Sequence, residues 1–200
     1  RQVCQASFKN KRDPEKVEKA LKEYISKNSQ DGDNQKKNKS LSLDFELGHA
    51  DRYFLTDEND EPNHFEMYIE SKGILKSKEI LTLALSILKS KIDKFKINLN
   101  KIISNNEDSD IITITESPDT MKSYDIQIMN ETRTLGNVIQ NYTTMLNNDA
   151  LLFIGYKNPH PLKKYIIIKI STSNHSLDEV NTILNQTCDK IIEVIDSLVV

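Results

Sequence analysis

The fold is decided by the stretch ETRTLGNVI at residues 131–139, together with FIGYKNPHPL at residues 153–162. The first stretch predicts the start of a helix, because Thr134 can cap it and apolar side chains follow at helical spacing. Gly136 falls in the first turn, where the missing Cβ lets another backbone or a bulky side chain come close. We therefore expect this helix to present an apolar face to a closely packed neighbour.

The second stretch predicts a strand that ends in a stiff turn. Its apolar part, which includes Gly155 and Tyr156, has the composition of a buried strand. Pro159 and Pro161 flank His160. They stiffen the connection to the next strand, since proline fixes φ and removes a hydrogen-bond donor.

Around these two stretches the sequence predicts the order β-β-α-β-β-α. Period-two patterns of isoleucine indicate strands, and apolar residues three and four apart indicate helices. The elements are strands near 112–114, 126–128, 151–156 and 165–170, a helix over 134–146, and a last helix opened by the capping-box sequence at 176–179. This order favours an α+β fold with helices on one face of antiparallel sheets.

The part of the chain before residue 111 predicts a shorter unit of the same kind. Residues 65–69 alternate as a strand, Lys72 and Gly73 form a turn, and 77–97 have the apolar stripe of a long helix. Residues 98–110 are polar and predict a linker. Further upstream we expect a strand at 2–8, a helix from Pro14 capped by Asp13, a loop at 28–40, a strand at 41–47 and an acidic turn at 56–63.

Composition excludes several classes of protein. The chain has 200 residues and a net charge of −3, so we expect no tight binding of nucleic acid, which needs clustered Lys and Arg. Two cysteines, Cys4 and Cys188, cannot build a four-ligand zinc site without histidine, and they suggest a reducing, intracellular compartment. No apolar run reaches the roughly 18 residues of a membrane span, so we expect no membrane segment.

The patterns that accompany catalysis are missing, and we expect no catalytic residue, metal or cofactor. None of the five glycines is spaced as a phosphate-binding loop. Cys188 lies on the apolar stripe of the last helix, which favours a core thiol. The histidines show no metal-ligand spacing; they are His49, His64, His160 and His175.

The two stretches together resemble the smaller α-like subunit of archaeal and eukaryotic RNA polymerases. That family has an acidic-x-His-Thr-Leu-Gly-Asn opening to its first helix and a Gly-Tyr-x-x-Pro-His-Pro turn, and Arg133 stands here at the usual histidine. The resemblance covers 111–200. It implies a dimerisation module that packs against the larger α-like subunit and has no catalytic residue.

Residues 64–73, HFEMYIESKG, followed by the long helix, resemble the end of the larger α-like subunit. The resemblance implies that 1–97 is the end of that subunit, with 1–62 left from its inserted domain and 63–97 its dimerisation strand and helix. Larger and smaller α-like parts in one chain, of the archaeal D and L type, are similar to the fused subunit of large nucleocytoplasmic DNA viruses. The family's cysteine cluster has no equivalent here.

The resemblance implies an assembly scaffold in which two dimerisation modules pair about a pseudo-twofold axis, with the helices at 77–97 and 134–146 packed together. Its partners would be the large catalytic subunits, small zinc-binding subunits and a missing amino-terminal half of the larger module. Its location would be the site of transcription: the nucleus, or a viral factory and virion. The interface residues would be Ile80, Ala84, Ile87, Leu88, Leu135, Gly136, Val138, Ile139 and Tyr142.

Two other hypotheses about function stay open. One is a free-standing dimeric regulator that uses the α-type dimerisation fold, and the other is an enzyme on an unrelated α+β fold. The first residue is Arg1, and the chain opens directly on an apolar-alternating segment, so we expect a piece of a longer chain. The helix at 77–97 is apolar beyond one stripe, so we also expect Leu83 or Leu85 to contact another polypeptide.

Overall fold

The structure is a computed structural model that describes residues 3–28, 35–105, 109–118, 122–146, 149–160 and 162–198. It consists of two compact units, Arg1–Ile80 and Leu81–Val200, which are described separately below.

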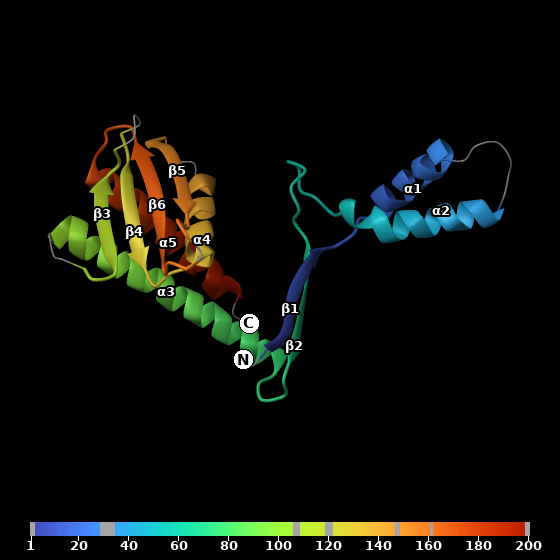
Figure 1. The fold of residues 1–200 in the computed structure, drawn as a ribbon, viewed down its shortest axis with the longest axis horizontal. Helices are drawn as coiled ribbons and strands as arrows, with labels where there is room; N and C mark the ends of the chain where they lie inside the picture. The colour runs from blue at the N-terminus through green and yellow to red at the C-terminus, as the bar shows by residue number, and fades with distance from the viewer. Residues whose placement is uncertain are drawn as a thin grey trace. The chain divides into compact units, whose positions relative to one another are not determined.

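The second unit is built on a four-stranded antiparallel sheet in the order β3-β4-β6-β5 (Figure 1). The strands are β3 (Ile112–Glu116), β4 (Tyr124–Met129), β5 (Leu151–Lys157) and β6 (Tyr165–Thr172). Helices α4 (Arg133–Met145) and α5 (Leu177–Leu198) pack together on one face of this sheet. The α+β class, with antiparallel strands and helices on one face, is confirmed.

Period-two alternation along the central strands sets the inner face of the sheet. In β6, Ile166, Ile168 and Ile170 are completely buried, while the residues between them are partly exposed. Helix α5 meets this face with a stripe that is buried at Val180, Leu184, Cys188 and other positions three or four residues apart. Burying side chains of this size stabilises the fold by about 1.5–3 kcal/mol each, so the sheet and its helices form a substantial core.

The α5 start follows the predicted capping box in part. Ser176 Oγ accepts a hydrogen bond from the backbone N–H of Asp178, at 3.2 Å. Glu179 reaches back to Asn174, whose backbone and side-chain nitrogens donate to its carboxylate, and not to Ser176. At α4 the predicted cap is wrong: Thr132 occupies the N-cap position without a side-chain cap, and Thr134 lies inside the helix.

Helix α3 (Ser77–Asn105) is longer than expected, and the helix end predicted at Ile97 is wrong. Residues 98–105 of the expected linker are helical because the apolar stripe continues: Leu99 is completely buried, and Ile102 and Ile103 pack against the core. This stripe adds α3 to the core of the second unit.

Polar contacts tie α3 to α5 in an antiparallel arrangement. Lys89 Nζ lies 2.6 Å from Asp196 Oδ1, Lys96 pairs with Asp189, and Asn181 Nδ2 donates to Ser104 Oγ at 3.1 Å. Between these pairs, Asn100 and Asn185 exchange two side-chain hydrogen bonds of 3.1 and 2.9 Å. The expected partner of α3 was the helix at 134–146; most of the polar contacts are with α5, and Lys91 pairs with Glu131, just before α4. The apolar stripe alone could not distinguish the two helices, since both carry one.

The first unit contains a two-stranded antiparallel ribbon, β1 (Val3–Asn10) with β2 (Phe65–Ser71). Its helices are α1 (Pro14–Asn28), α2 (Gln35–Gly48) and the short η1 (Ala50–Arg52). Asp13 Oδ1 accepts from the backbone N–H groups of Glu15 and Lys16, which confirms the predicted cap. The ribbon ends in the predicted turn, where Gly73 has φ +92°.

The loop at 28–40 and the strand at 41–47 were wrong, because residues 35–48 form α2; residues 29–34 lie outside the described part of the chain. The alternation was ambiguous, since Leu41 and Phe45 are also four residues apart, as are Leu43 and Leu47. Phe45 is buried beside Tyr24, with ring centroids 5.5 Å apart, while Leu43 and Leu47 are exposed. One helical face therefore packs, and the other faces solvent.

Candidate assembly surfaces

The residues of α4 expected at an interface lie mostly in the second unit's own core. Leu135, Gly136 and Ile139 are buried there, and Val138 and Tyr142 pack against it with part of their surface exposed. Whether a partner also contacts this helix stays a prediction. What the structure shows is that its apolar stripe first holds the helix on its own sheet.

Gly136 makes the close approach that the sequence predicts, and the neighbour is Tyr156 of β5. A Cβ at Gly136 would lie 2.8 Å from Cδ2 and 2.9 Å from Cγ of the Tyr156 ring, and 3.2 Å from Cδ1 of Ile166. Both glycine and tyrosine belong to the two stretches that decide the fold. The stretches thus meet in space, which explains why they occur together.

The stretch at 153–162 has contacts with α4 and within itself. Gln140 Oε1 accepts from the backbone N–H of Tyr156 at 3.2 Å, and Gly155 lies under the Phe153 ring, whose Cζ would be 2.9 Å from an added Cβ. His160 Nδ1 accepts from the backbone N–H of Leu162 at 3.1 Å. Pro159 is exposed, and Pro161 lies outside the described residues. These contacts hold the end of the sheet in one shape.

The residues of α3 expected at an interface are divided between core and solvent. Leu88 packs against the core of the second unit, as does Leu85. Ala84 and Ile87 are exposed, the latter by 51%, and Ile80 is half-buried. Leu83 is 50% exposed, so it is available for the contact with another polypeptide that we expect, while Leu85 is covered within the unit.

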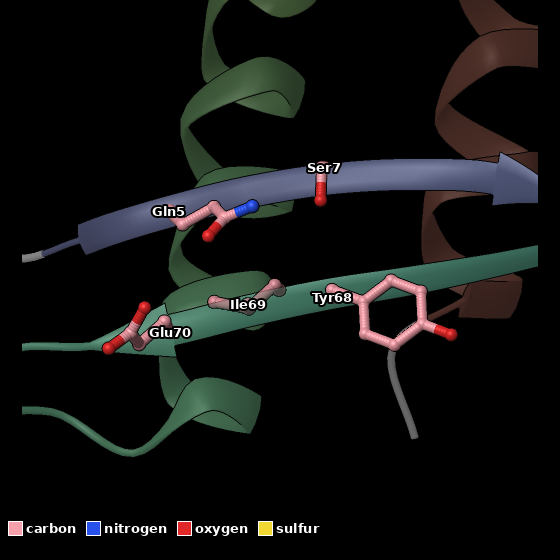
Figure 2. Close-up of a pocket in the computed structure, with 5 residues that line it drawn as sticks. All are labelled: Gln5, Ser7, Tyr68, Ile69 and Glu70. Atoms are coloured by element: carbon pink, nitrogen blue, oxygen red, sulfur yellow. The ribbon is translucent and has the colours of Figure 1, made fainter.

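The β1–β2 ribbon has one polar and one apolar face. Figure 2 shows a pocket on the ribbon that is lined by Gln5, Ser7, Tyr68, Ile69 and Glu70, and all of these except Ile69 are polar. Next to it, Lys9 Nζ lies 3.4 Å from Glu66 Oε2 and 5.4 Å from the centre of the Tyr68 ring. The Tyr68 and Glu66 contacts raise the pKa of Lys9.

The opposite face of the ribbon carries its apolar side chains, because successive residues of a strand point to opposite sides. Phe8 is paired with Met67 across the ribbon, and its ring meets that of Phe65 edge-on at 6.3 Å. These three side chains are 68%, 60% and 55% exposed. The apolar face of this two-stranded ribbon is therefore exposed, and a two-stranded ribbon is only marginally stable in water by itself.

Titratable groups in the second unit have structural settings. Burial raises the pKa of Cys188 to about 12, which keeps the thiol protonated and unreactive. His175 stacks on Tyr124 with ring centroids 4.7 Å apart, and the Tyr124 hydroxyl donates to the His175 carbonyl at 3.1 Å. Burial, followed by the Glu116 carboxylate, raises the pKa of Tyr124. No sequence pattern predicts the Tyr124–His175 pair, because the two residues are 51 positions apart.

Within the described ranges, no group of three His, Cys, Asp or Glu residues is arranged to hold a metal ion. Over the same part of the chain, no helix has the length and apolar composition needed to cross a membrane.

The segment that contains the Gly136–Tyr156 contact has known relatives. Residues 123–199 match the RNA polymerase Rpb3/Rpb11 dimerisation domain. The match extends from the start of β4 to the end of α5 and includes both stretches that decide the fold. It supports an α-like RNA polymerase subunit for this part of the chain.

Two nematode proteins are similar over shorter segments. The probable DNA-directed RNA polymerase II subunit RPB11 of Caenorhabditis elegans is 45% identical over 49 residues, and that of Caenorhabditis briggsae is 43% identical over 47. Each alignment covers 24% of this chain. It spans 38% of the length of the first relative and 37% of the second, well under half of either protein.

Proposed function

We propose that the chain is a non-catalytic assembly subunit of a multisubunit DNA-directed RNA polymerase. The observation that carries the proposal is the match of 123–199 to the Rpb3/Rpb11 dimerisation domain, in which Gly136 and Tyr156 make a contact that only glycine permits. The holoenzyme would be the nucleotidyltransferase, and this subunit would hold its large catalytic subunits and small zinc-binding subunits together.

We further propose that the two α-like parts are joined in one chain, with 1–97 from the larger and 111–200 from the smaller, as in large DNA viruses. The support is α3: its residues before 98 precede the matched region and yet contact α5, the last helix of that region, through the Lys89–Asp196 and Lys96–Asp189 pairs. A helix of one module against a helix of the other is what a pseudo-twofold dimerisation interface requires. The site of action would be the nucleus, or a viral factory and virion.

We also propose the amino-terminal half of the larger α-like module as a partner. The exposed apolar face of the β1–β2 ribbon supports this proposal. This face, with Phe8, Phe65 and Met67, needs cover, and the second unit shows how such cover is made: its own sheet buries the apolar face under α4 and α5. In the same way, further strands and a helix would cover the ribbon.

Co-purification tests the function. The full chain, tagged and expressed in its source, should bring down two large polymerase subunits in one-to-one stoichiometry, and the complex should elongate RNA. A soluble homodimer without large subunits would instead support the free-standing dimeric regulator, and an isolated chain with a measurable reaction of its own would support an enzyme. The purified chain should bind duplex DNA no more tightly than the roughly 10⁻⁴–10⁻⁶ M typical of non-specific contact.

A further inference from the structure

A small pocket of about 180 Å³ lies in the second unit, between α3, the ends of β3 and β4, and the start of α4. Its floor is apolar, with Phe95, Ile128 and Leu135 buried. The charged residues that line the pocket are Lys91, Lys94 and Glu131. The walls are held by backbone hydrogen bonds from Met129 N–H to Ile111 O, at 2.8 Å, and from Asn130 N–H to Lys164 O, at 2.6 Å. The pocket is therefore formed in advance.

The size of the pocket indicates what fits into it. Sites for small ligands and cofactors usually measure roughly 300–1,000 Å³, so a cavity of about 180 Å³ is too small for them. It is large enough for one aliphatic or aromatic side chain. Protein interfaces concentrate their binding energy in anchors of this kind, inserted into apolar pockets and surrounded by polar groups.

The charge around the pocket indicates what should stand next to that side chain. Lys91 Nζ lies 2.7 Å from Glu131 Oε2, so these two charges neutralise each other. Lys94 is exposed and has no ionic partner among the described residues. One positive charge therefore remains, and a carboxylate beside the inserted side chain would complement it.

The pocket continues an exposed stripe of α3. Leu83 and Ile87 are four residues apart, and Ile87 precedes Lys91 by four residues and Lys94 by seven, so all of them lie on one side of the helix. Both apolar residues are about half exposed. A segment lying along this stripe would reach the pocket without changing direction.

We propose that the pocket is a docking site for a segment of another polymerase subunit. The segment inserts one large aliphatic or aromatic side chain above Phe95 and places a carboxylate, one to four residues away, against Lys94. This proposal rests on the proposed function, because it requires that the chain assemble with other subunits, and it adds the chemistry by which one of them is recognised.

Lysine acetylation footprinting tests the proposal on the protein as it exists. The free full chain and the purified polymerase complex are treated with N-hydroxysuccinimidyl acetate, and modification of each lysine is quantified by mass spectrometry. Lys101 is the internal control, since it is exposed and lies seven residues after Lys94 on the same side of α3. We expect acetylation of Lys94 to fall at least tenfold in the complex, and that of Lys101 to stay unchanged.

Matched variants supply a second readout. Lys94→Glu and Ile111→Glu place a negative charge at the pocket, on residues that are exposed, Ile111 by 40%. Lys101→Glu and Ile97→Glu make the same changes outside it, Ile97 being 55% exposed. With wild-type and variant chains competing for assembly in one cell, the pocket variants should be depleted from the complex about tenfold, and the two controls should not be.

The possible outcomes distinguish a failure of the docking-site proposal from a failure of the proposed function. If large subunits co-purify but Lys94 remains as reactive as in the free chain, the pocket proposal is wrong and the function stands. If Lys94 is already protected in the free chain, a segment of the same chain fills the pocket, and the proposal is again wrong. If no polymerase subunit co-purifies, the function fails and the docking site falls with it.

Discussion

The two units differ in where their apolar side chains go. Among the described residues, the buried apolar side chains of the first unit are Phe45 and Ala50, and all the others lie in the second unit. Yet the first unit is not poor in apolar residues: Phe8, Leu47, Phe65 and Met67 are all more than half exposed. Both units therefore contain large apolar side chains, and they differ in whether other parts of the same unit bury them.

That difference shows what each unit requires. In the second unit three helices cover the inner face of a four-stranded sheet, so the core is complete within the chain. In the first unit a two-stranded ribbon offers an apolar face, and a ribbon of two strands is marginal in water until something packs on it. The second unit should therefore fold by itself, and the first should gain stability from a partner.

The largest expected effect is the difference between a charge placed in the core of the second unit and the same charge placed on the exposed ribbon face. Ile139 is completely buried, so Ile139→Asp places an unpaired carboxylate in the core and should lower the free energy of unfolding by about 4 kcal/mol or more. Phe65 is 55% exposed, so Phe65→Asp should change it by about 0.5 kcal/mol at most. Urea denaturation, followed by circular dichroism, measures both variants.

The same pair tests assembly. Phe65→Asp should leave the free chain folded and still weaken its incorporation into the complex, because a charge on the ribbon face opposes cover by a partner. If Phe65→Asp destabilises the free chain as much as Ile139→Asp does, the ribbon is already covered and the contrast between the units disappears.

The reactivity of Cys188 is a second measure of how complete the core is. Burial raises the pKa of this thiol to about 12, and only the thiolate reacts with iodoacetamide. In a Cys4→Ser background, Cys188 should therefore react at pH 8 at least about a thousandfold more slowly than a cysteine placed on the ribbon by Phe65→Cys. Mass spectrometry of timed samples gives the two rates, and a ratio below ten would contradict a closed core.

Sequence patterns predicted helices and strands correctly where one face of the element is buried in the core. The isoleucines of β6 and the α5 stripe are examples, because burial enforces their period. The patterns failed at 41–47, where residues two apart are also four apart, and only the packing of Phe45 on Tyr24 decides for a helix. They also could not pair Lys91 with Glu131 or Asn100 with Asn185, since such partners, 40 and 85 residues apart, become neighbours only through the fold.

Replacing a glycine by alanine should change the free energy of unfolding by a smaller amount, and in opposite directions at Gly136 and Gly48. Gly136→Ala would bring Cβ to within 2.9 Å of two atoms of the Tyr156 ring, and crowding of this kind costs about 1–3 kcal/mol. Gly48, at the end of α2, has nothing within 4 Å of an added Cβ, so Gly48→Ala should be neutral or stabilise by up to about 1 kcal/mol. Thermal denaturation measures both. Equal effects would mean that the approach of α4 to β5 is looser than the structure shows.

The smallest effect concerns the contact between α3 and α5 inside the second unit. Asn100 and Asn185 are partly buried and exchange two hydrogen bonds, so Asn100→Ala leaves the Asn185 oxygen without this donor and should cost about 0.5–1.5 kcal/mol. Once the pair is broken, Asn185→Ala should cost little more, which gives a coupling energy of about 0.5–1 kcal/mol in a double-mutant cycle. Asn141→Ala is the control, because its 3.2 Å hydrogen bond to Asn137 is exposed on α4 and contributes little. Strictly additive costs would show that α3 does not rest on α5 in solution, and α3 would then belong with the uncovered ribbon.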